Sequence, residues 1–270
     1  MQDFSAIADE VAAAAPITVQ SVPVVPGRRV HIDADMLAYQ CGGGDDMDVA
    51  TSRRILTSKI NLICEAAGAE FFMLHLTGSG STKGDRALVA VTKPYQGQRK
   101  GDKPKNWRYL RDYMAEGLAG PVKQWFDREA DDGFGFILYH EPGAVICTRD
   151  KDMRMLSGIH LNWDTYELVT VPPNCWQLEA GGKVFGYKWF LMQMLHGDTA
   201  DNIPNLRYRY GEATAYKALA QANAPDAESG VRVVADLFKA EYGEGWALRF
   251  VESACLLWMR RDKGGWLHNW

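Results

Sequence analysis

The sequence lacks the features that mark membrane, secreted and zinc-binding proteins. No run of eighteen apolar residues occurs in its 270 positions, which argues against a transmembrane helix. The first residues, MQDFSAIADEVAAAAP, carry an early acid and no basic segment, so they do not resemble a secretory signal. The five cysteines are scattered, without a CxxC motif or a cysteine–histidine spacing for zinc. We therefore expect free thiols in a cytoplasmic protein without membrane contact.

An excess of positive charge is also missing. The formal net charge is −4, which taken alone argues weakly against a nucleic-acid binder. The charges are unevenly distributed, however, because one stretch collects basic residues, namely Lys93, Arg99, Lys100, Lys103, Lys105, Arg108 and Arg111. A cationic strip beside an anionic, metal-filled pocket can still hold a phosphate backbone.

Acids occur in four short groups, each placed where a strand would end or a helix begin. They are Asp33 and Asp35 in VHIDAD, Glu129, Asp131 and Asp132 in EADD, Asp150 and Asp152 in TRDKD, and Asp198 and Asp201 in GDTADN. Clustered carboxylates raise each other's pKa unless cations neutralise them. Oxygen-only clusters suit Mg²⁺ or Mn²⁺, and two such ions ~4 Å apart drive phosphodiester cleavage. The pattern therefore indicates a metal-dependent nuclease.

Each acidic group also has a simpler interpretation. The first could end a strand, and EADD could begin a helix, where acids favour the dipole. The TRDKD acids could be solvated loop residues, and those of GDTADN could cap a helix. Helical spacing would place Glu129 and Asp132 on one face. Only the combination of the four groups favours a metal site.

Apolar patterns predict strands that alternate with helices. Strands are expected at 28–33, 70–78, 144–148, 158–163 and 166–171, and helices at 47–67, 106–128, 187–195, 211–222, 231–242 and 246–261. This order favours an α/β fold with a mainly parallel sheet covered on both faces. Ligands of such sheets bind outside the carboxyl ends of the strands, where Asp33, Asp150 and Asp152 would converge. The tryptophans and methionines near the C-terminus, including Trp258 and Met259, are expected in the core.

The segment from Gly78 to Asn106 is rich in glycine and lysine. It is too polar to pack and too long for an ordinary connection, so we expect a mobile functional segment. Tyr95, Trp107 and Tyr109 lie among the basic residues of the stretch 93–111, and such a mixture suits a single strand through phosphate neutralisation and base stacking. A solvated basic surface is the alternative.

Five motifs together resemble one enzyme family. HIDADML, PYQGQR, EADD, TRDKD and GDTADNIP occur in the order and rough spacing of the flap endonuclease superfamily. The chain is similar in particular to bacteriophage 5′–3′ exonucleases, relatives of the 5′-nuclease domain of bacterial DNA polymerase, over about residues 28–220. The resemblance implies a PIN-like α/β fold with a helical arch at about 78–118. It also implies two-metal hydrolysis of DNA at 5′ ends or flaps.

The resemblance also implies a domain division and specific site residues. Residues 1–27 would be a loosely attached leader, 28–195 the nuclease domain, and 196–270 a helical, helix–hairpin–helix-like region that grips duplex DNA. The catalytic residues would be Asp33, Glu129, Asp131, Asp150, Asp152, Asp198 and the arch arginine Arg99. The metal ligands would be the same acids with Asp201, and with Asp132 behind them. The DNA contacts would come from Lys93, Tyr95, Gln96, Arg99, Lys100, Lys103, Lys105 and Gly211.

The chain departs from the family pattern at three places. Gln96 stands where the family has its arch lysine, so the phosphate contact is expected from Lys93 or Lys100. The acid usual after the second strand is replaced by LTGSGS, which leaves Asp35 or Asp85 as candidates. The glycine-rich hairpin is reduced to NLRYRYGEA, which retains one glycine.

These departures leave alternatives open. A PIN-type ribonuclease would share the acidic pocket, and an inactive DNA-binding relative would keep the fold without the site. RNA in an RNA–DNA hybrid remains open as a second substrate, and a phage replication polymerase as a partner. We expect a monomer.

Overall fold

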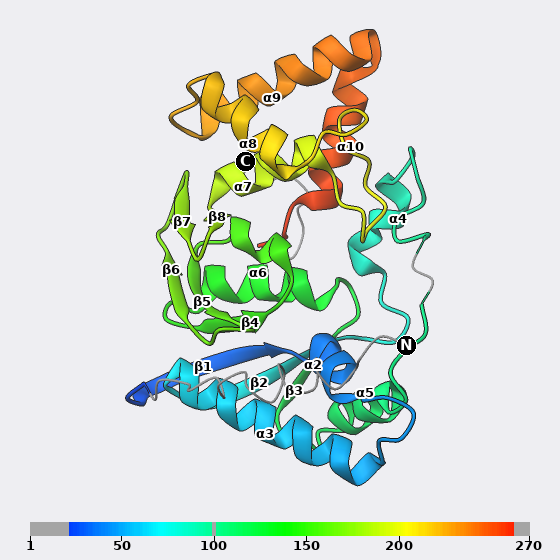
Figure 1. Cartoon of the computed structure of the whole chain (residues 1–270), viewed down its shortest axis with the longest axis vertical. Helices are drawn as coiled ribbons and strands as arrows, with labels where there is room; N and C mark the ends of the chain where they lie inside the picture. Colours follow the sequence, from blue (N-terminus) through cyan, green and yellow to red (C-terminus); the bar gives the residue numbers. More distant parts are fainter. Residues whose placement is uncertain (1–21, 99–100, 262–270) are drawn as a thin grey trace, which may run out of the picture.

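A six-stranded sheet forms the centre of the computed structural model, which describes residues 22–98 and 101–261 (Figure 1). Its strands lie in the order β3-β2-β1-β4-β5-β6. Their bounds are Val25–Asp33 for β1, Ala69–Thr77 for β2, Val122–Trp125 for β3, Val145–Thr148 for β4, Gly158–Asn162 for β5 and Leu168–Val171 for β6. The first five strands run parallel, and β6 pairs antiparallel with β5. The expected mainly parallel α/β fold is confirmed.

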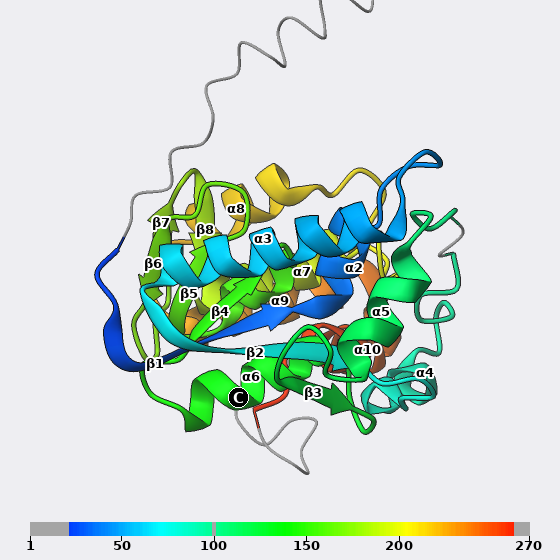
Figure 2. The ribbon, with the colours of Figure 1, turned by 90° about the horizontal axis from the view of Figure 1, so that it is seen from below.

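Helices cover both faces of this sheet. One face carries α2 (Ala34–Cys41), α3 (Val49–Ala67) and α5 (Trp107–Ala115), and Figure 2 shows α3 crossing in front of the strands. The other face carries α6 (Ala130–His140), which contacts β1 to β5 (Figure 1). The predicted helix at 47–67 is confirmed: Asp48 caps its N-terminus, and Gly68 ends it in the left-handed conformation.

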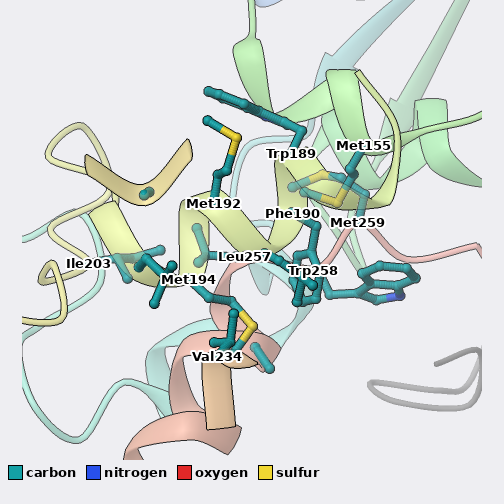
Figure 3. Close-up of a cluster of buried hydrophobic side chains, with 14 of the residues drawn as sticks. Met155, Trp189, Phe190, Met192, Met194, Ile203, Val234, Leu257, Trp258 and Met259 are labelled. Carbon is teal, nitrogen blue, oxygen red and sulfur yellow. The ribbon is translucent and has the colours of Figure 1, made fainter. Parts of the chain in front are cut away.

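A second core lies among the C-terminal helices. Helices α7 (Tyr187–His196), α8 (Glu212–Gln221), α9 (Ala227–Tyr242) and α10 (Trp246–Leu257) pack together, beside a small hairpin of β7 (Leu178–Ala180) and β8 (Lys183–Phe185). Figure 3 shows Phe190, Met194, Leu257 and Trp258 meeting there. Trp258 and Met259 are buried, as expected. No helix within the described residues is both long and apolar enough to span a membrane.

Two predicted boundaries are wrong. The expected helix at 106–128 ends at Ala115, because Gly117 and Gly120 adopt positive φ before the edge strand β3. The expected leader also extends too far, because β1 begins at Val25, whose backbone N–H donates to Gly68 O at 2.9 Å. Residues 1–21 lie outside the described residues.

The segment expected to be mobile is instead packed in its first half. It forms a short 3₁₀ turn at Lys83–Asp85 and helix α4 (Arg86–Val89). The Arg86 side chain is only 2% exposed, and Val89 and Tyr95 pack against the C-terminal core. The prediction failed because an arginine that looks solvated in the sequence has a buried carboxylate partner.

Candidate active site

An open cavity of about 1140 Å³ lies at the carboxyl ends of the parallel strands. Asp33 ends β1, and Asp150 follows the adjacent strand β4 by two residues. From this pair of strands the chain continues outward in opposite directions, which is the usual ligand position in open α/β sheets. Six carboxylates line the cavity, namely those of Asp33, Asp35, Glu129, Asp131, Asp150 and Asp201.

Asp33 is held rigidly at the first turn of α2. Its Oδ1 accepts a hydrogen bond from Met36 N at 2.9 Å, and its Oδ2 accepts one from Thr148 Oγ1 at 2.8 Å. Burial, and then the neighbouring charge of Asp35, raise the pKa of Asp33 to about 7. The two hydrogen bonds offset only part of this effect.

Asp131 and Asp150 complete a group of three mutually repelling acids. Asp131 lies in the first turn of α6, and burial followed by the charges of Asp150 and Asp33 raises its pKa well above the ordinary value. Burial is also the main cause that raises the pKa of Asp150 to about 6. Within the described part of the chain, no ion pair joins these three carboxylates to a cation, although the nearby charge of Lys151 offsets part of the effect on Asp150. They therefore form a site of largely uncompensated negative charge.

Asp35 is neutralised, unlike these three. Arg111 pairs with its Oδ1 and also donates to Thr77 O, while Thr77 N donates to Asp35 Oδ2 at 2.9 Å. Of the two candidates for the acid missing after the second strand, only Asp35 lines the cavity, because Asp85 is exposed outside it.

Asp132 serves a different purpose from its neighbour Asp131. Its fully buried carboxylate accepts two hydrogen bonds from the Arg86 guanidinium, at 2.7 and 2.9 Å, and a third from Arg260 N at 3.0 Å. Such a bidentate pair uses the oxygens that a metal ion would need. We therefore leave Asp132 out of the ligand set proposed below.

Asp152 and Asp198 lie behind Asp150, outside the cavity lining. Asp152 accepts a hydrogen bond from Gln193 Nε2, and Lys151 Nζ lies 3.0 Å from Asp198 Oδ2. The loop that carries Asp198 and Asp201 needs a glycine at its start. Gly197 has φ 67°, and a Cβ there would lie 2.5 Å from Ile203 O.

Tyr95 and Gln96 bridge the last two acids of the cavity. Gln96 Nε2 donates to Glu129 Oε1 at 2.9 Å and to Asp201 Oδ1 at 3.0 Å. The Tyr95 hydroxyl lies 2.7 Å from Glu129 Oε2 and 3.0 Å from Asp201 Oδ2. Neutral donors thus occupy the oxygens between these two carboxylates.

The donor set is chemically suited to a hard divalent ion, because it consists of carboxylate oxygens alone. In the present arrangement, no three His, Cys, Asp or Glu side chains among the described residues are placed to hold a metal ion. At Glu129 and Asp201 the physical reason is that Tyr95 and Gln96 already donate hydrogen bonds to the carboxylate oxygens. A cation would have to replace these donors.

Comparison with known proteins identifies the fold. No family model matches the chain, and no curated protein matches it. The T5 5′-exonuclease with bound zinc ions superposes with a TM-score of 0.55 at 13% identity, covering 86% of this chain and 100% of that one. The T5 D15 protein co-crystallised with metal ions gives 0.54 at 12% identity, covering 85% and 93%. The bacteriophage T5 D15 flap endonuclease in a pseudo-enzyme–product complex with DNA and metal ions gives 0.53 at 12%, covering 85% and 99%.

The fold is that of the 5′-nucleases. The expected resemblance is thereby confirmed at the level of architecture, and the activity of this chain is argued below from its own residues.

One side of the cavity is aromatic and cationic. Lys103 Nζ lies 3.5 Å from the centre of the Trp107 ring, and Arg111 CZ lies 5.3 Å from it. Tyr39 meets Trp107 edge to face and remains 46% exposed. The sequence analysis missed Tyr39 because one tyrosine in a short helix has no distinguishing signal. Lys83, which also lines the cavity, was missed because it sits in a glycine-rich run.

The other residues expected to contact DNA have different positions. Lys93 is exposed outside the cavity lining, and Lys105 Nζ donates to Asp45 O. Gly211 is the exposed residue that precedes α8. Arg99 and Lys100 lie outside the described residues.

Proposed function

We propose that this chain is a metal-dependent 5′ nuclease that hydrolyses DNA phosphodiesters at 5′ ends or flaps. One observation carries the proposal: Asp33, Asp131 and Asp150 converge where the sheet connectivity reverses, and no ion pair with a described residue neutralises them. Burying uncompensated acids destabilises a protein, so such a cluster indicates a bound cation. The fold shared with the T5 5′-exonuclease supports this assignment.

In this proposal the acids divide between two Mg²⁺ or Mn²⁺ ions. Asp33, Glu129 and Asp131 hold one, and a second group holds the other, consisting of Asp150, Asp152, Asp198 and Asp201. When bound, the ions supply an activated water and neutralise charge that develops on the phosphate.

The chain's own residues keep the ligands in place. Thr148 and the α2 backbone fix the orientation of Asp33, and Gln193 fixes that of Asp152. Arg99 is proposed to stabilise charge on the phosphate, as the arch arginine of the family does.

DNA would approach along the aromatic and cationic side of the cavity. Bases of a single strand stack on exposed rings, and Lys103 beside Trp107 adds phosphate neutralisation. Residues 196–270, including Gly211, are proposed to bind the duplex. We place the activity in phage DNA replication, in the cytoplasm of an infected bacterium, with a monomeric enzyme and a replication polymerase as partner. RNA in an RNA–DNA hybrid is included as a second substrate.

A single assay tests the proposal and its rivals. A 5′-labelled duplex, a 5′-flap substrate and an RNA hairpin are each incubated with Mg²⁺ and with EDTA. Cleavage of the DNA substrates in Mg²⁺ alone is expected. Cleavage of the RNA hairpin in their place would indicate a ribonuclease, and DNA binding without cleavage would indicate an inactive relative.

A further inference from the structure

Among the described residues, four basic side chains line the acidic cavity, and three of them already have specific contacts. Arg111 pairs with Asp35. Arg149 Nε lies 3.4 Å from Asp164 Oδ1. Lys103 Nζ lies over the Trp107 ring. These contacts tie the two arginines to carboxylates and place Lys103 over the ring, where it is proposed to neutralise phosphates of the bound single strand.

Lys83 is the fourth, and its ammonium has weak partners. Lys83 Nζ donates to the neutral Gln96 Oε1, and its ion pair with Glu129 Oε1 is long, at 3.9 Å. The side chain is 43% exposed. An ammonium carries three donors, so donors remain for a ligand inside the cavity.

The backbone around Lys83 is fixed against the loop that connects β3 to Glu129. Thr82 N donates to Phe126 O at 2.9 Å, and Gly84 N donates to Asp127 O at 3.2 Å. Lys83 itself has φ 53°, an uncommon conformation for a residue with a side chain. Strained backbone that its surroundings hold in place is found preferentially at functional sites.

Gln96 fixes the other end of the same side chain. Its amide N–H groups are used by Glu129 and Asp201, which orients Oε1 toward Lys83 Nζ. The ammonium is therefore positioned from both ends beside the proposed metal ligands. Preorganised positive charge of this kind stabilises the charge that develops on a phosphate in the transition state.

We propose that Lys83 is a catalytic cation of this active site in addition to Arg99, contacting the phosphate under attack, and that Gln96 is its positioning residue. This inference rests on the proposed nuclease function and deepens it. It also replaces the expectation that Lys93 or Lys100 makes this contact.

The test exchanges charge between positions 83 and 96. Lys83→Met keeps the aliphatic stem and removes the charge, so the single-turnover cleavage rate on a 5′-flap DNA should fall about 10²- to 10³-fold, with a much smaller change in DNA affinity. Lys83→Arg should retain more activity than Lys83→Met. Lys123→Met, on the edge strand away from the cavity, serves as the matched control and should cleave at the wild-type rate.

The decisive variant is the double substitution. In Lys83→Met/Gln96→Lys the new ammonium lies next to the vacated position, so the rate should recover at least about tenfold relative to Lys83→Met. Gln96→Lys alone should be no faster than wild type, because it brings two ammonium groups together. Thermal melting confirms that each variant is folded.

The outcomes separate this inference from the proposed function. If wild type cleaves and folded Lys83→Met cleaves within about threefold of it, the catalytic role of Lys83 is overturned while the nuclease function stands. A double variant no faster than Lys83→Met also overturns it, because the loss would then not reflect charge at this place. If wild type cleaves none of the DNA substrates, the proposed function fails first.

Discussion

Asp131 and Asp132 are adjacent in the sequence, yet their surroundings differ completely. Asp132 is buried against Arg86, which compensates its charge with two hydrogen bonds. Asp131 faces Asp33 and Asp150, and burial with these like charges raises its pKa well above the usual range. The comparison teaches that burial of an acid does not by itself mark function. The mark is a cluster of acids that no ion pair with another described residue neutralises.

The largest expected effect is on the cleavage rate of a variant at Asp131. Asp131→Asn should reduce the cleavage rate by about 10³-fold or more, since a lost metal ligand removes several kcal/mol of transition-state stabilisation. Its free energy of unfolding in EDTA should stay equal or rise, because a repelling charge is removed. Single-turnover kinetics and urea unfolding measure both. A marked loss of stability in Asp131→Asn would contradict the claimed difference between Asp131 and Asp132.

Asp132→Asn should mainly lower stability, in contrast to Asp131→Asn, which should mainly lower activity. Removing one partner of a buried ion pair strands the Arg86 charge and should lower the free energy of unfolding by about 3–5 kcal/mol. Urea unfolding of wild type and variant gives this value. Replacing both partners, as in Arg86→Met/Asp132→Leu, should recover much of the loss. A variant as stable as wild type would show that the pair has no structural role.

Much of this arrangement followed from sequence pattern alone. The apolar runs before Asp33 and Asp150 predicted parallel strands, and parallel strands deliver their carboxyl ends to one edge. The pairing of Arg86 with Asp132 could not be predicted, because it joins residues 46 positions apart through side-chain geometry. The edge strand β3 was missed because its four residues continue the helical spacing that precedes them. Lys83 gave no signal, since its role depends on the contact with Gln96.

A third buried group consists of two histidines, which are linked to each other and to Trp125 by hydrogen bonds. His31 Nδ1 lies 2.9 Å from His75 Nε2, and the Trp125 indole N–H donates to His75 Nδ1 at 2.9 Å. An indole only donates, so His75 Nδ1 accepts and its Nε2–H is the donor toward His31. Burial lowers the pKa of His31 to about 4 and that of His75 well below its usual value.

This group should make folding acid-sensitive. A histidine with a folded pKa below its unfolded value contributes stability that is full above about pH 6.5 and is lost as the pH falls toward 4. The stability advantage of wild type over His31→Leu should therefore shrink by about 2–3 kcal/mol between about pH 7.5 and about pH 4.5. Urea unfolding in EDTA measures it. Taking the difference cancels the opposite slope of Asp33, whose raised pKa adds stability on acidification. A constant difference would contradict neutral, buried histidines.

The smallest effect concerns the donors that bridge Glu129 and Asp201. Tyr95→Phe removes a hydroxyl that competes for carboxylate oxygens, so Mg²⁺ affinity should rise by about two- to fivefold, equivalent to about 0.5–1 kcal/mol. Tyr139→Phe, on the exposed end of α6, is the control and should leave the affinity unchanged. Weaker binding by Tyr95→Phe would mean that the hydroxyl supports the metal site.

Calorimetric titration of Mn²⁺ or Mg²⁺ into EDTA-stripped protein tests the central claim most directly. The cluster of Asp33, Asp131 and Asp150 should give saturable binding heat in wild type, weakened at least about tenfold in Asp150→Asn and unchanged in an exposed-acid control such as Asp236→Asn. Absence of divalent-ion uptake by the wild-type protein, or equal uptake by Asp150→Asn, would contradict the account.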